Sequence, residues 1–343
     1  MKISYTRIAD TLCDWFDKNQ RDLPWRHTDD PYAIWVAEIM LQQTRVEAVL
    51  NHYTDFMRRF PNIAALAQSS SEEIKLAWRG LGYYRRAENL RLGAIFIIEH
   101  YNGVFPNTLD AIRSIPGVGA YTAGAIASFA YDIPVPAVDG NVLRVISRIC
   151  NLTDSVDTPA VHSLITEIVR RMIPANRVWS YNQGLMELGA IVCLPGNPCC
   201  QRCPLIEYCL GFAAGNPELL PVRRSKNKPV VLNREVFLVR NNGTVLLHRR
   251  PETGLLAGLW EFPGKEAPEF PNLPVESMEK RFILHARHVF THIIWEMDGY
   301  EIHAAERFSL PSDNWRWVPL TELHSYAIPS AMNSFLAFLL PGK

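Results

Sequence analysis

Four cysteines that lie just past the middle of the chain constrain its fold most strongly. Cys193, Cys200, Cys203 and Cys209 follow the spacing C-x6-C-x2-C-x5-C in the segment CLPGNPCCQRCPLIEYC. The spacers are long enough for the chain to turn, so all four thiolates can bind one soft metal centre. Structural zinc sites usually contain two short cysteine pairs, whereas this segment contains only one. The spacing therefore favours a [4Fe-4S] cluster, and zinc binding or four unligated cysteines are the alternatives.

The remaining cysteines indicate a reducing compartment. Cys199 adjoins Cys200 but disrupts the spacing on both sides, so we interpret it as a bystander. Cys13 and Cys150 bring the total to seven, an odd number without the spacing typical of secreted domains, and no apolar signal segment follows Met1. We therefore expect a cytoplasmic protein, associated with the nucleoid if its source is bacterial. No run of about 18 apolar residues occurs, so we expect no membrane span.

The length and the residue pattern predict two domains. The chain has 343 residues and a formal net charge of zero; each half can bury a core, and a neutral chain can still carry a local basic face. Apolar residues recur at helical intervals up to about residue 190, which predicts an all-α domain over 1–216. The proline-rich, basic segment 217–229 is typical of an exposed linker. Residues 230–343 contain β-rich runs around an Asn-Asn-Gly turn and predict an α+β domain that a helix closes.

Glu38 lies on the apolar stripe of a helical pattern that continues over residues 32–60 and stops at Pro61. Ile34 and Leu41 share this stripe with it. A carboxyl group in such a position must be paired, neutral or exposed to a cavity. Burial would raise its pKa and keep it partly protonated, as a general acid requires. The alternative is a surface glutamate on a helix with a rotated register.

Asp139 follows the extended segment IPVPAV and precedes the predicted helix NVLRVISR, so we expect it to be a helix N-cap. N-cap hydrogen bonds and the helix dipole would keep its carboxylate ionised. One carboxyl group held near neutrality and one held anionic form the pair that cleavage of a glycosidic bond needs. A purely structural capping role is the alternative.

The turn that contains Gly117 and Gly119 separates two predicted helices. Its backbone N–H groups, together with the following helix N-terminus, can bind a nucleic-acid phosphate without reading the base sequence. An ordinary corner between two helices is the alternative.

Two pairs that contain aromatic residues are candidates for contacts with a nucleic acid. Tyr83 and Tyr84 lie among arginines at a predicted loop tip, which suits insertion into a stack of bases; packed tyrosines at a helix start are the alternative. Trp25 and Arg26 are expected either to pack in the core or to form the wall of a pocket.

In combination, these motifs are similar to those of one family. The chain resembles the A/G-specific adenine DNA glycosylases of the MutY type, in the helix–hairpin–helix superfamily that includes endonuclease III. The matching segments span nearly the whole chain: LPWR, EIMLQQTRV, GLGYYRRAENL, PGVGAYTAGAIASFA, VDGNVLRV, ELGAIVC, the cysteine spacing and LLHRRPETGLLAGLWEFPG. The resemblance implies a monomer that flips adenine out of double-stranded DNA and removes it opposite 8-oxoguanine or guanine.

The resemblance also implies roles for individual residues. Glu38 would protonate adenine, Asp139 would stabilise the oxocarbenium-like sugar, Asn141 would orient Asp139, and Tyr121 would lie near the sugar. Lyases similar to endonuclease III have a lysine nucleophile where this chain has Tyr121, so a monofunctional hydrolase is implied. The residues implied to probe the lesion and the gap left by the flipped base are Gln43, Thr44, Leu81 and Tyr83.

The C-terminal domain resembles a Nudix fold that lacks the box G-x5-E-x7-R-E-x2-E-E-x-G. The acidic residues that would bind magnesium are missing after GLWEFPGKEAPEF. The domain is therefore expected to recognise a lesion rather than to hydrolyse a nucleotide. The family reads 8-oxoguanine with a Phe-Ser-His loop. Here the loop is Phe290-Thr291-His292, and the threonine keeps the hydroxyl group.

Three other functions compete with this interpretation. An endonuclease III-like glycosylase/lyase is disfavoured by Tyr121 and by the second domain, and a Nudix hydrolase of oxidised nucleotides is disfavoured by the missing box. A non-catalytic iron–sulfur module that binds DNA or senses redox state is disfavoured by Glu38 on an apolar stripe.

Overall fold

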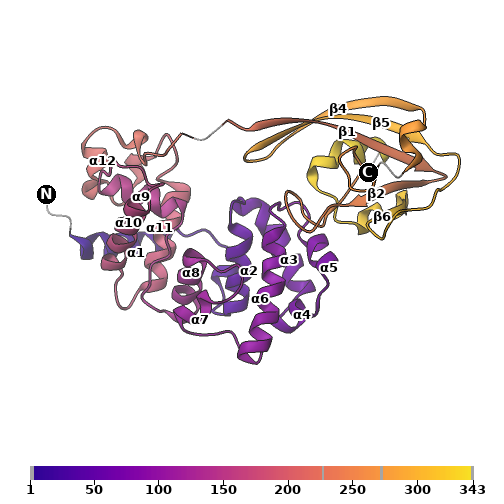
Figure 1. Cartoon of the computed structure of the whole chain (residues 1–343). Coiled ribbons are helices and arrows are strands. Elements are labelled where there is room, and N and C mark those ends of the chain that lie inside the picture. Colours follow the sequence, from indigo (N-terminus) through magenta and orange to yellow (C-terminus); the bar gives the residue numbers. More distant parts are fainter. Residues whose placement is uncertain (1–3, 226–227, 271–272, 341–343) are drawn as a thin grey trace. The chain divides into compact units, whose positions relative to one another are not determined.

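The computed structural model describes residues 4–225, 228–270 and 273–340 (Figure 1). Two residues of the predicted linker, Lys226 and Asn227, therefore lie outside the described residues. The predicted fold class is confirmed, because an all-α region precedes a region that contains a mixed sheet. No described helix is both long and apolar enough to cross a membrane.

The chain divides into two compact units whose borders differ from the predicted domains. The first unit comprises Met1–Gln68 and Leu92–Ser225, and the second comprises Ser69–Arg91 and Lys226–Lys343. The second unit thus combines a short helical segment with the C-terminal sheet.

Helices that bury apolar residues build the first unit. They are α1 (Tyr5–Asn19), η1 (Pro24–Arg26), α2 (Pro31–Leu41), α3 (Val46–Arg59), α4 (Ile63–Gln68), α7 (Leu109–Arg113), α8 (Ala120–Tyr131), α9 (Gly140–Ile149), α10 (Pro159–Met172), α11 (Val178–Ile191), η2 (Cys200–Arg202), η3 (Ile206–Tyr208), α12 (Leu210–Ala213) and η4 (Pro217–Leu219). The helix α5 (Ser71–Ala77) belongs to the second unit, and α6 (Arg85–Tyr101) continues from the second unit into the first.

The prediction of a continuous helical pattern up to Pro61 is wrong in one respect, because these residues form two helices, α2 and α3. The turn between them contains Gln43, whose φ of 58° lies in the left-handed region that helix interiors exclude. Both helices bury apolar residues. The apolar spacing therefore continues across the break, and no glycine or proline marks it.

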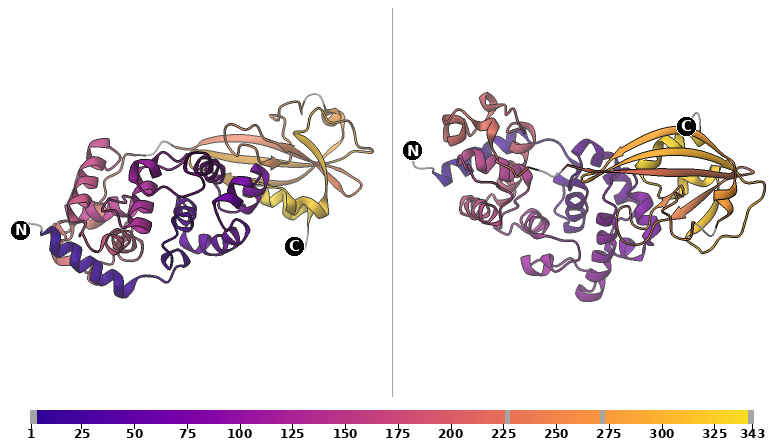
Figure 2. Two further views of the ribbon diagram at one scale, coloured as in Figure 1. Left: turned by 90° about the horizontal axis from the view of Figure 1, so that it is seen from below. Right: turned by 45° about the horizontal axis from the view of Figure 1, so that its top comes forward.

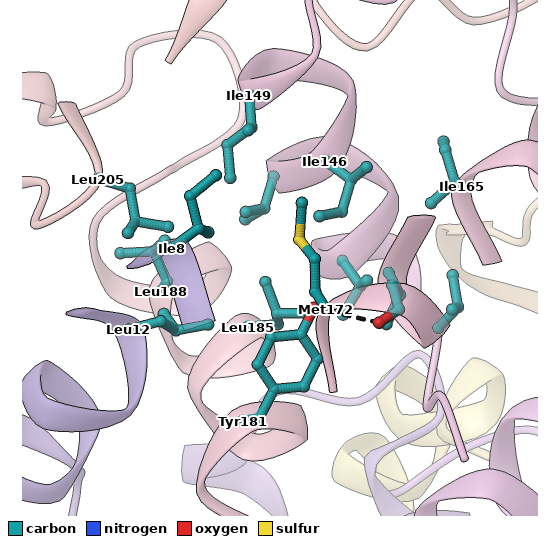
Figure 3. Packing of buried hydrophobic residues seen from close by; sticks show 14 of the residues in the cluster. Ile8, Leu12, Ile146, Ile149, Ile165, Met172, Tyr181, Leu185, Leu188 and Leu205 are labelled. Atoms are coloured by element: carbon teal, nitrogen blue, oxygen red, sulfur yellow. Dashed lines mark hydrogen bonds between the residues drawn. The ribbon is translucent and has the colours of Figure 1, made fainter. Parts of the chain in front are cut away.

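One apolar core joins α1, α9, α10 and α11 in the first unit (Figure 3). Ile8 from α1, Ile146 from α9 and Leu185 from α11 are completely buried in it. Leu205, from the cysteine-containing segment, packs into the same core. This packing ties the cysteine segment to α9 and α11.

The strands of the second unit form one mixed sheet. They are β1 (Val230–Asn241), β2 (Thr244–Arg249), β3 (Trp260–Glu261), β4 (Lys280–Val289), β5 (Ile293–His303) and β6 (Trp315–Pro319). The order is β3-β2-β1-β5-β4, with β6 also paired to β2; β1 and β5 run parallel and the other pairs are antiparallel. The predicted hairpin is confirmed, since Asn242 and Gly243 take positive φ values of 39° and 76° between β1 and β2, as a tight hairpin turn requires.

Alternate residues of β1 enter two different cores. Val236 and Leu238 pack with Phe335 of the C-terminal helix α13 (Asn333–Leu339), whereas Phe237 and Val239 face the opposite core. The helix α13 and its neighbouring 3-10 turns η7 (Leu320–Ser325) and η8 (Ser330–Met332) thus cover one face of the sheet, as Figure 2 shows in yellow. The opposite core includes residues that precede the turn η6 (Pro274–Ser277).

The described contacts between Ser69–Arg91 and the rest of the second unit include an ion pair and two hydrogen bonds. The ammonium group of Lys75, which is 4% exposed, lies 3.6 Å from the Glu252 carboxylate. Arg79 donates to the backbone carbonyl of His324 at 3.1 Å. The hydroxyl group of Tyr83 lies 2.8 Å from that of Thr291.

Candidate active site

Glu38 lies inside the first unit, on a helix that is buried on nearly every side. All residues from Tyr32 to Met40 of α2 are buried, and Glu38 is 3% exposed, so the surface-glutamate alternative is excluded. Tyr121, in the first turn of α8, donates its hydroxyl hydrogen to Oε2 of Glu38 at 2.5 Å. Burial raises the pKa of Glu38 to about 7, the negative charge of Asp139 acts in the same direction, and the Tyr121 hydrogen bond opposes both.

Asp139 is the N-cap of α9, as predicted. Its Oδ1 accepts a hydrogen bond from the backbone N–H of Val142 at 2.8 Å, and its Oδ2 accepts one from the side-chain amide of Asn141 at 2.7 Å. These bonds lower the pKa of Asp139, as predicted, but burial has the larger effect and raises the pKa above its ordinary value. Both carboxyl groups of the site are therefore harder to ionise than ordinary ones.

Tyr121 binds one carboxyl group of the site and lies close enough to the other for its charge to act on it. Besides its bond to Glu38, its hydroxyl group contacts Sδ of Met186 on α11 at 3.4 Å. Burial, together with the charges of Glu38 and Asp139, raises the pKa of Tyr121 well above its ordinary value, so the hydroxyl group stays protonated. The helix α8 contacts both α2 and α11, and α11 contacts α9. These contacts bring Glu38, Tyr121 and Asp139 together from three helices.

A buried ion pair next to this group was not found from the sequence. Glu187 of α11 is 1% exposed and binds Arg26 at 2.8 Å and Arg21 at 2.8 Å. Burial would raise the pKa of Glu187, but the hydrogen bonds from the two arginines lower it to about 2. The positive charge of Arg26 also lowers the pKa of Glu38, which places Arg26 near the catalytic candidates. The signal that singled out Glu38, a glutamate among apolar helix residues, was equally present at Glu187.

Arg144 forms a second link that sequence reasoning missed. Its Nη2 donates to Oδ1 of Asn141 at 2.8 Å and to the carbonyl oxygen of Gly189 at 2.8 Å. Its Nε donates to the carbonyl oxygen of Cys193 at 2.8 Å. A Cβ atom on Gly189 would lie 2.5 Å from Cβ of Asn141, so this close approach of α9 and α11 needs a glycine. The bonds join Asp139, through Asn141, to the first cysteine of the motif.

The four cysteines of the motif line one cavity, together with Cys199 and Arg148. Cys193, Cys200 and Cys209 each influence the pKa of Cys203 electrostatically, so these thiols lie near one another. Among the described residues, no group of three or more histidine, cysteine or acidic side chains is arranged to hold a single metal ion. A four-iron cluster is wider than one ion and needs its thiolates farther apart. Four thiols around one cavity are the set of ligands that a four-iron cluster uses.

The glycine turn has the predicted position before α8. Gly117 has φ +80°, and Gly119 is the N-cap of α8 with nothing within 4 Å of its Cβ position. The turn therefore leaves the backbone accessible two residues before Tyr121. Its contact with a phosphate stays a prediction.

The residues expected to probe DNA differ in exposure. Gln43 and Tyr83 are exposed and both have positive φ, and Thr44 is half-buried. Leu81 is buried, so probing a duplex would require this side chain to leave its packing. Tyr84 is buried as well, which supports the packing alternative for that one tyrosine. Trp25 is 5% exposed and packs edge-on against a tyrosine of α3.

The loop expected to read the lesion connects β4 and β5. The N–H group of Phe290 donates to the carbonyl oxygen of Ile293 at 2.8 Å, and its ring packs edge-on against Trp295 with 4.9 Å between the ring centres. Thr291 and His292 are exposed. Two residues that the sequence suggested separately, Tyr83 and Thr291, are thus hydrogen-bonded neighbours.

Two family models match the chain. Residues 36–171 match the HhH-GPD superfamily of base excision DNA repair proteins, and residues 235–338 match the NUDIX domain. The first match contains Glu38, Tyr121 and Asp139, and the second contains the loop Phe290–His292.

The chain is similar to several proteins named adenine DNA glycosylase. The protein of Homo sapiens is 30% identical over 95% of this chain and 73% of its own length, and that of Mus musculus is 31% identical over 95% and 76%. The protein of Buchnera aphidicola subsp. Baizongia pistaciae is 34% identical over 74% of this chain and 72% of its own length.

Among solved structures, a thermostable thymine-DNA glycosylase aligns with a TM-score of 0.56 and 29% identity, covering 61% of this chain and 97% of that chain. A trapped covalent intermediate of endonuclease III with DNA aligns with a TM-score of 0.54 and 23% identity, covering 62% of this chain and 99% of that chain. At 23% identity this second likeness shows a shared fold.

Proposed function

Because the chain belongs to the adenine DNA glycosylases of base excision repair, we propose that it hydrolyses the N-glycosidic bond of adenine paired with 8-oxoguanine or guanine, without lyase activity. The observation that carries this proposal is the buried Glu38, whose carboxyl group has a pKa of about 7 beside Tyr121 and Asp139. A buried carboxyl group with this pKa suits a general acid that works near neutral pH.

Glu38 is the proposed proton donor. At pH 7, a carboxyl group with a pKa of about 7 is protonated in about half of the molecules. The Tyr121 hydroxyl group donates to Oε2 and fixes the orientation of the carboxyl group, so the proton would be carried on Oε1. Its transfer to a ring nitrogen of the flipped adenine turns the base into a neutral leaving group.

Asp139 is the proposed stabiliser of the sugar. As the glycosidic bond breaks, positive charge develops on the sugar ring, and a nearby carboxylate lowers the energy of that state. The bonds from Val142 and Asn141 hold the carboxylate in place. Burial raises its pKa, but a cation that forms nearby favours the ionised form. The positive charge that develops on the sugar therefore favours the carboxylate form of Asp139.

The absence of lyase activity is inferred from Tyr121. A phenol cannot form the imine that an amine nucleophile forms with the opened sugar. The Tyr121 hydroxyl group is also occupied by its bond to Glu38, and its pKa is raised well above the ordinary value. A water molecule is therefore the proposed nucleophile.

A [4Fe-4S] cluster is the proposed cofactor. Cys193, Cys200, Cys203 and Cys209 would hold it, since they line one cavity, and four thiolates are the usual ligands of such a cluster. When bound, the cluster would cross-link four points of the segment 193–209. Through Arg144 this segment connects to Asn141 and Asp139, so an ordered segment would help to hold Asp139 in position.

The second unit is proposed to recognise 8-oxoguanine. The exposed Thr291 offers a hydroxyl group in the loop between β4 and β5, and Tyr83 lies beside it. Both residues can contact a duplex that bends around them.

Single-turnover excision on a duplex with one adenine opposite 8-oxoguanine tests the proposal. The protein should release adenine and leave an intact abasic strand, and borohydride should trap no covalent adduct. Glu38→Gln should still bind the duplex but lose excision. Cleavage of the strand with a trapped adduct would show a lyase, and excision by Glu38→Gln at the normal rate would remove Glu38 from the mechanism.

A further inference from the structure

The buried side chain of Arg148 holds both ends of the cysteine segment against α9. Its Nε donates to the carbonyl oxygens of Pro217 at 2.7 Å and Leu220 at 3.0 Å, which follow the segment. Its Nη1 donates to the carbonyl oxygen of Leu194 at 2.8 Å and to Sγ of Cys193 at 3.2 Å, at the beginning of the segment. The side chain is 1% exposed. One guanidinium group therefore closes the loop that carries the four thiols.

The remaining nitrogen of Arg148 has no partner. Nη2 is buried and makes no hydrogen bond to any described residue. Buried donors are almost always satisfied in folded proteins, and an unsatisfied one is destabilising. Arg144, one turn earlier on α9, differs in this respect, because both of its terminal nitrogens and its Nε reach oxygen atoms.

The cavity that Arg148 lines indicates where a partner for Nη2 would lie. Arg148 lines the same cavity as Cys193, Cys200, Cys203 and Cys209. The other walls are apolar or sulfur-containing side chains such as Val192, Ile206 and Phe212. None of these side chains offers an oxygen or nitrogen acceptor for Nη2, which leaves a group that fills the cavity as the candidate partner.

We propose that Nη2 of Arg148 donates a hydrogen bond to a sulfur atom of the cluster, and that this buried cation sets the reduction potential of the cluster and its retention. The inference rests on the proposed cofactor. A thiolate-bound cluster carries negative charge that becomes larger on reduction. A buried cation nearby stabilises the reduced form more than the oxidised form, so it raises the potential. Arg148 is thus a positioning and tuning residue, remote from the bond that is cleaved.

The same contact couples cluster insertion to closure of the loop. Without a cluster, Nη1 and Nε of Arg148 bind the carbonyl groups of Leu194 and Leu220, while Nη2 stays buried and unsatisfied. With a cluster, all three of its nitrogens are bonded. The cluster then strengthens the contacts that hold the loop, and the loop in turn retains the cluster.

Three variants of the whole chain test the proposal. Arg148→Met keeps most of the side-chain volume but removes the charge and the donors, and Arg148→Lys keeps the charge without the branched set of donors. Arg202→Met is the matched control, because Arg202 is an exposed arginine of the same segment. Iron and acid-labile sulfide are measured first in the unmodified protein. A protein without them would overturn the cofactor proposal and this inference together.

The readouts are the reduction potential from protein-film voltammetry and the rate at which oxidant and chelator remove the cluster. Arg148→Met should have a more negative potential and lose its cluster about 10-fold faster, the change expected for one lost hydrogen bond to a charged group. The potential and the rate of cluster loss of Arg148→Lys should lie between those of Arg148→Met and those of the unmodified protein. Both quantities in Arg202→Met should match those of the unmodified protein. A purely structural role would reduce the folded yield but leave the potential of the remaining loaded protein unchanged.

An Arg148→Met protein with full iron content, an unchanged potential and an unchanged rate of loss would overturn the inference while leaving the cofactor proposal intact. If Arg148→Met retains no iron, Arg148→Lys decides the question. A lowered potential in Arg148→Lys supports the inference, and a potential equal to that of the unmodified protein overturns it.

Discussion

Glu38→Gln is expected to abolish excision and, at alkaline pH, to stabilise the folded protein. The substitution keeps the shape of the side chain and an oxygen that can accept the Tyr121 hydrogen bond. It removes the only proton that Glu38 can transfer. The loss of activity and the gain of stability have the same origin, which is the burial of an ionisable group in α2.

The size of the stabilisation follows from the pKa of Glu38. Burial raises it from 4.5 to about 7, a difference equivalent to about 3 kcal/mol of free energy. The folded protein binds this proton more tightly than the unfolded chain does. The stability that the protonated group gives is therefore complete below pH 4.5, declines as the pH rises toward 7, and is lost above about pH 7. Glutamine stays neutral, so the variant escapes this decline.

Urea unfolding at several pH values measures the effect. The free energy of unfolding of Glu38→Gln should exceed that of the unmodified protein by up to about 3 kcal/mol at pH 8, and the two should converge near pH 4.5. Glu99→Gln, which changes an exposed glutamate of α6, provides the control and should follow the unmodified protein throughout. Single-turnover excision on the same preparations should show at least about a 10²-fold loss for Glu38→Gln alone.

A stability difference that does not depend on pH would refute the reasoning, since it would show that Glu38 ionises as easily in the folded protein as in the unfolded chain. A variant that is less stable at pH 8 than the unmodified protein would do the same.

Substitutions at three further positions probe the same site and the loop between β4 and β5. Asp139→Asn removes the charge offered to the sugar and should slow single-turnover excision by at least about 10²-fold while duplex binding persists; normal excision would contradict this. Tyr121→Phe removes a hydrogen bond that lowers the pKa of Glu38, so the pH at which excision falls to half its maximum should rise by about one to two pH units. A midpoint that stays in place or falls would show that this bond does not favour the ionised carboxylate. Thr291→Ala should reduce the preference for 8-oxoguanine over guanine by about 2- to 10-fold and Thr291→Ser should keep it, as paired excision assays on the two duplexes would show.

Features that depend on a few neighbouring residues could be predicted from the sequence. The capping role of Asp139 needed only the extended segment before it and the helix after it. The burial of Glu38 followed from the apolar residues around it on α2. The hairpin around Gly243 followed from its turn residues.

Features that depend on distant residues could not be predicted in this way. The bond between Tyr121 and Glu38, and the pair of Arg26 with Glu187, join residues that are 83 and 161 positions apart. Local pattern carries no information about such pairs. The pKa of Asp139 shows the same limit, because burial by remote helices outweighs the local hydrogen bonds that the sequence revealed.

The grouping of Ser69–Arg91 with the C-terminal sheet has a consequence for the order in which the protein is made. The residues that contact this segment, Glu252, Thr291 and His324, emerge from the ribosome long after it. At about 5–20 residues per second, the delay is on the order of 10 s. During that interval Lys75 cannot reach the carboxylate that accompanies it in the finished protein. The second unit therefore completes these contacts only after residue 324 has emerged, when the chain of the first unit has already emerged.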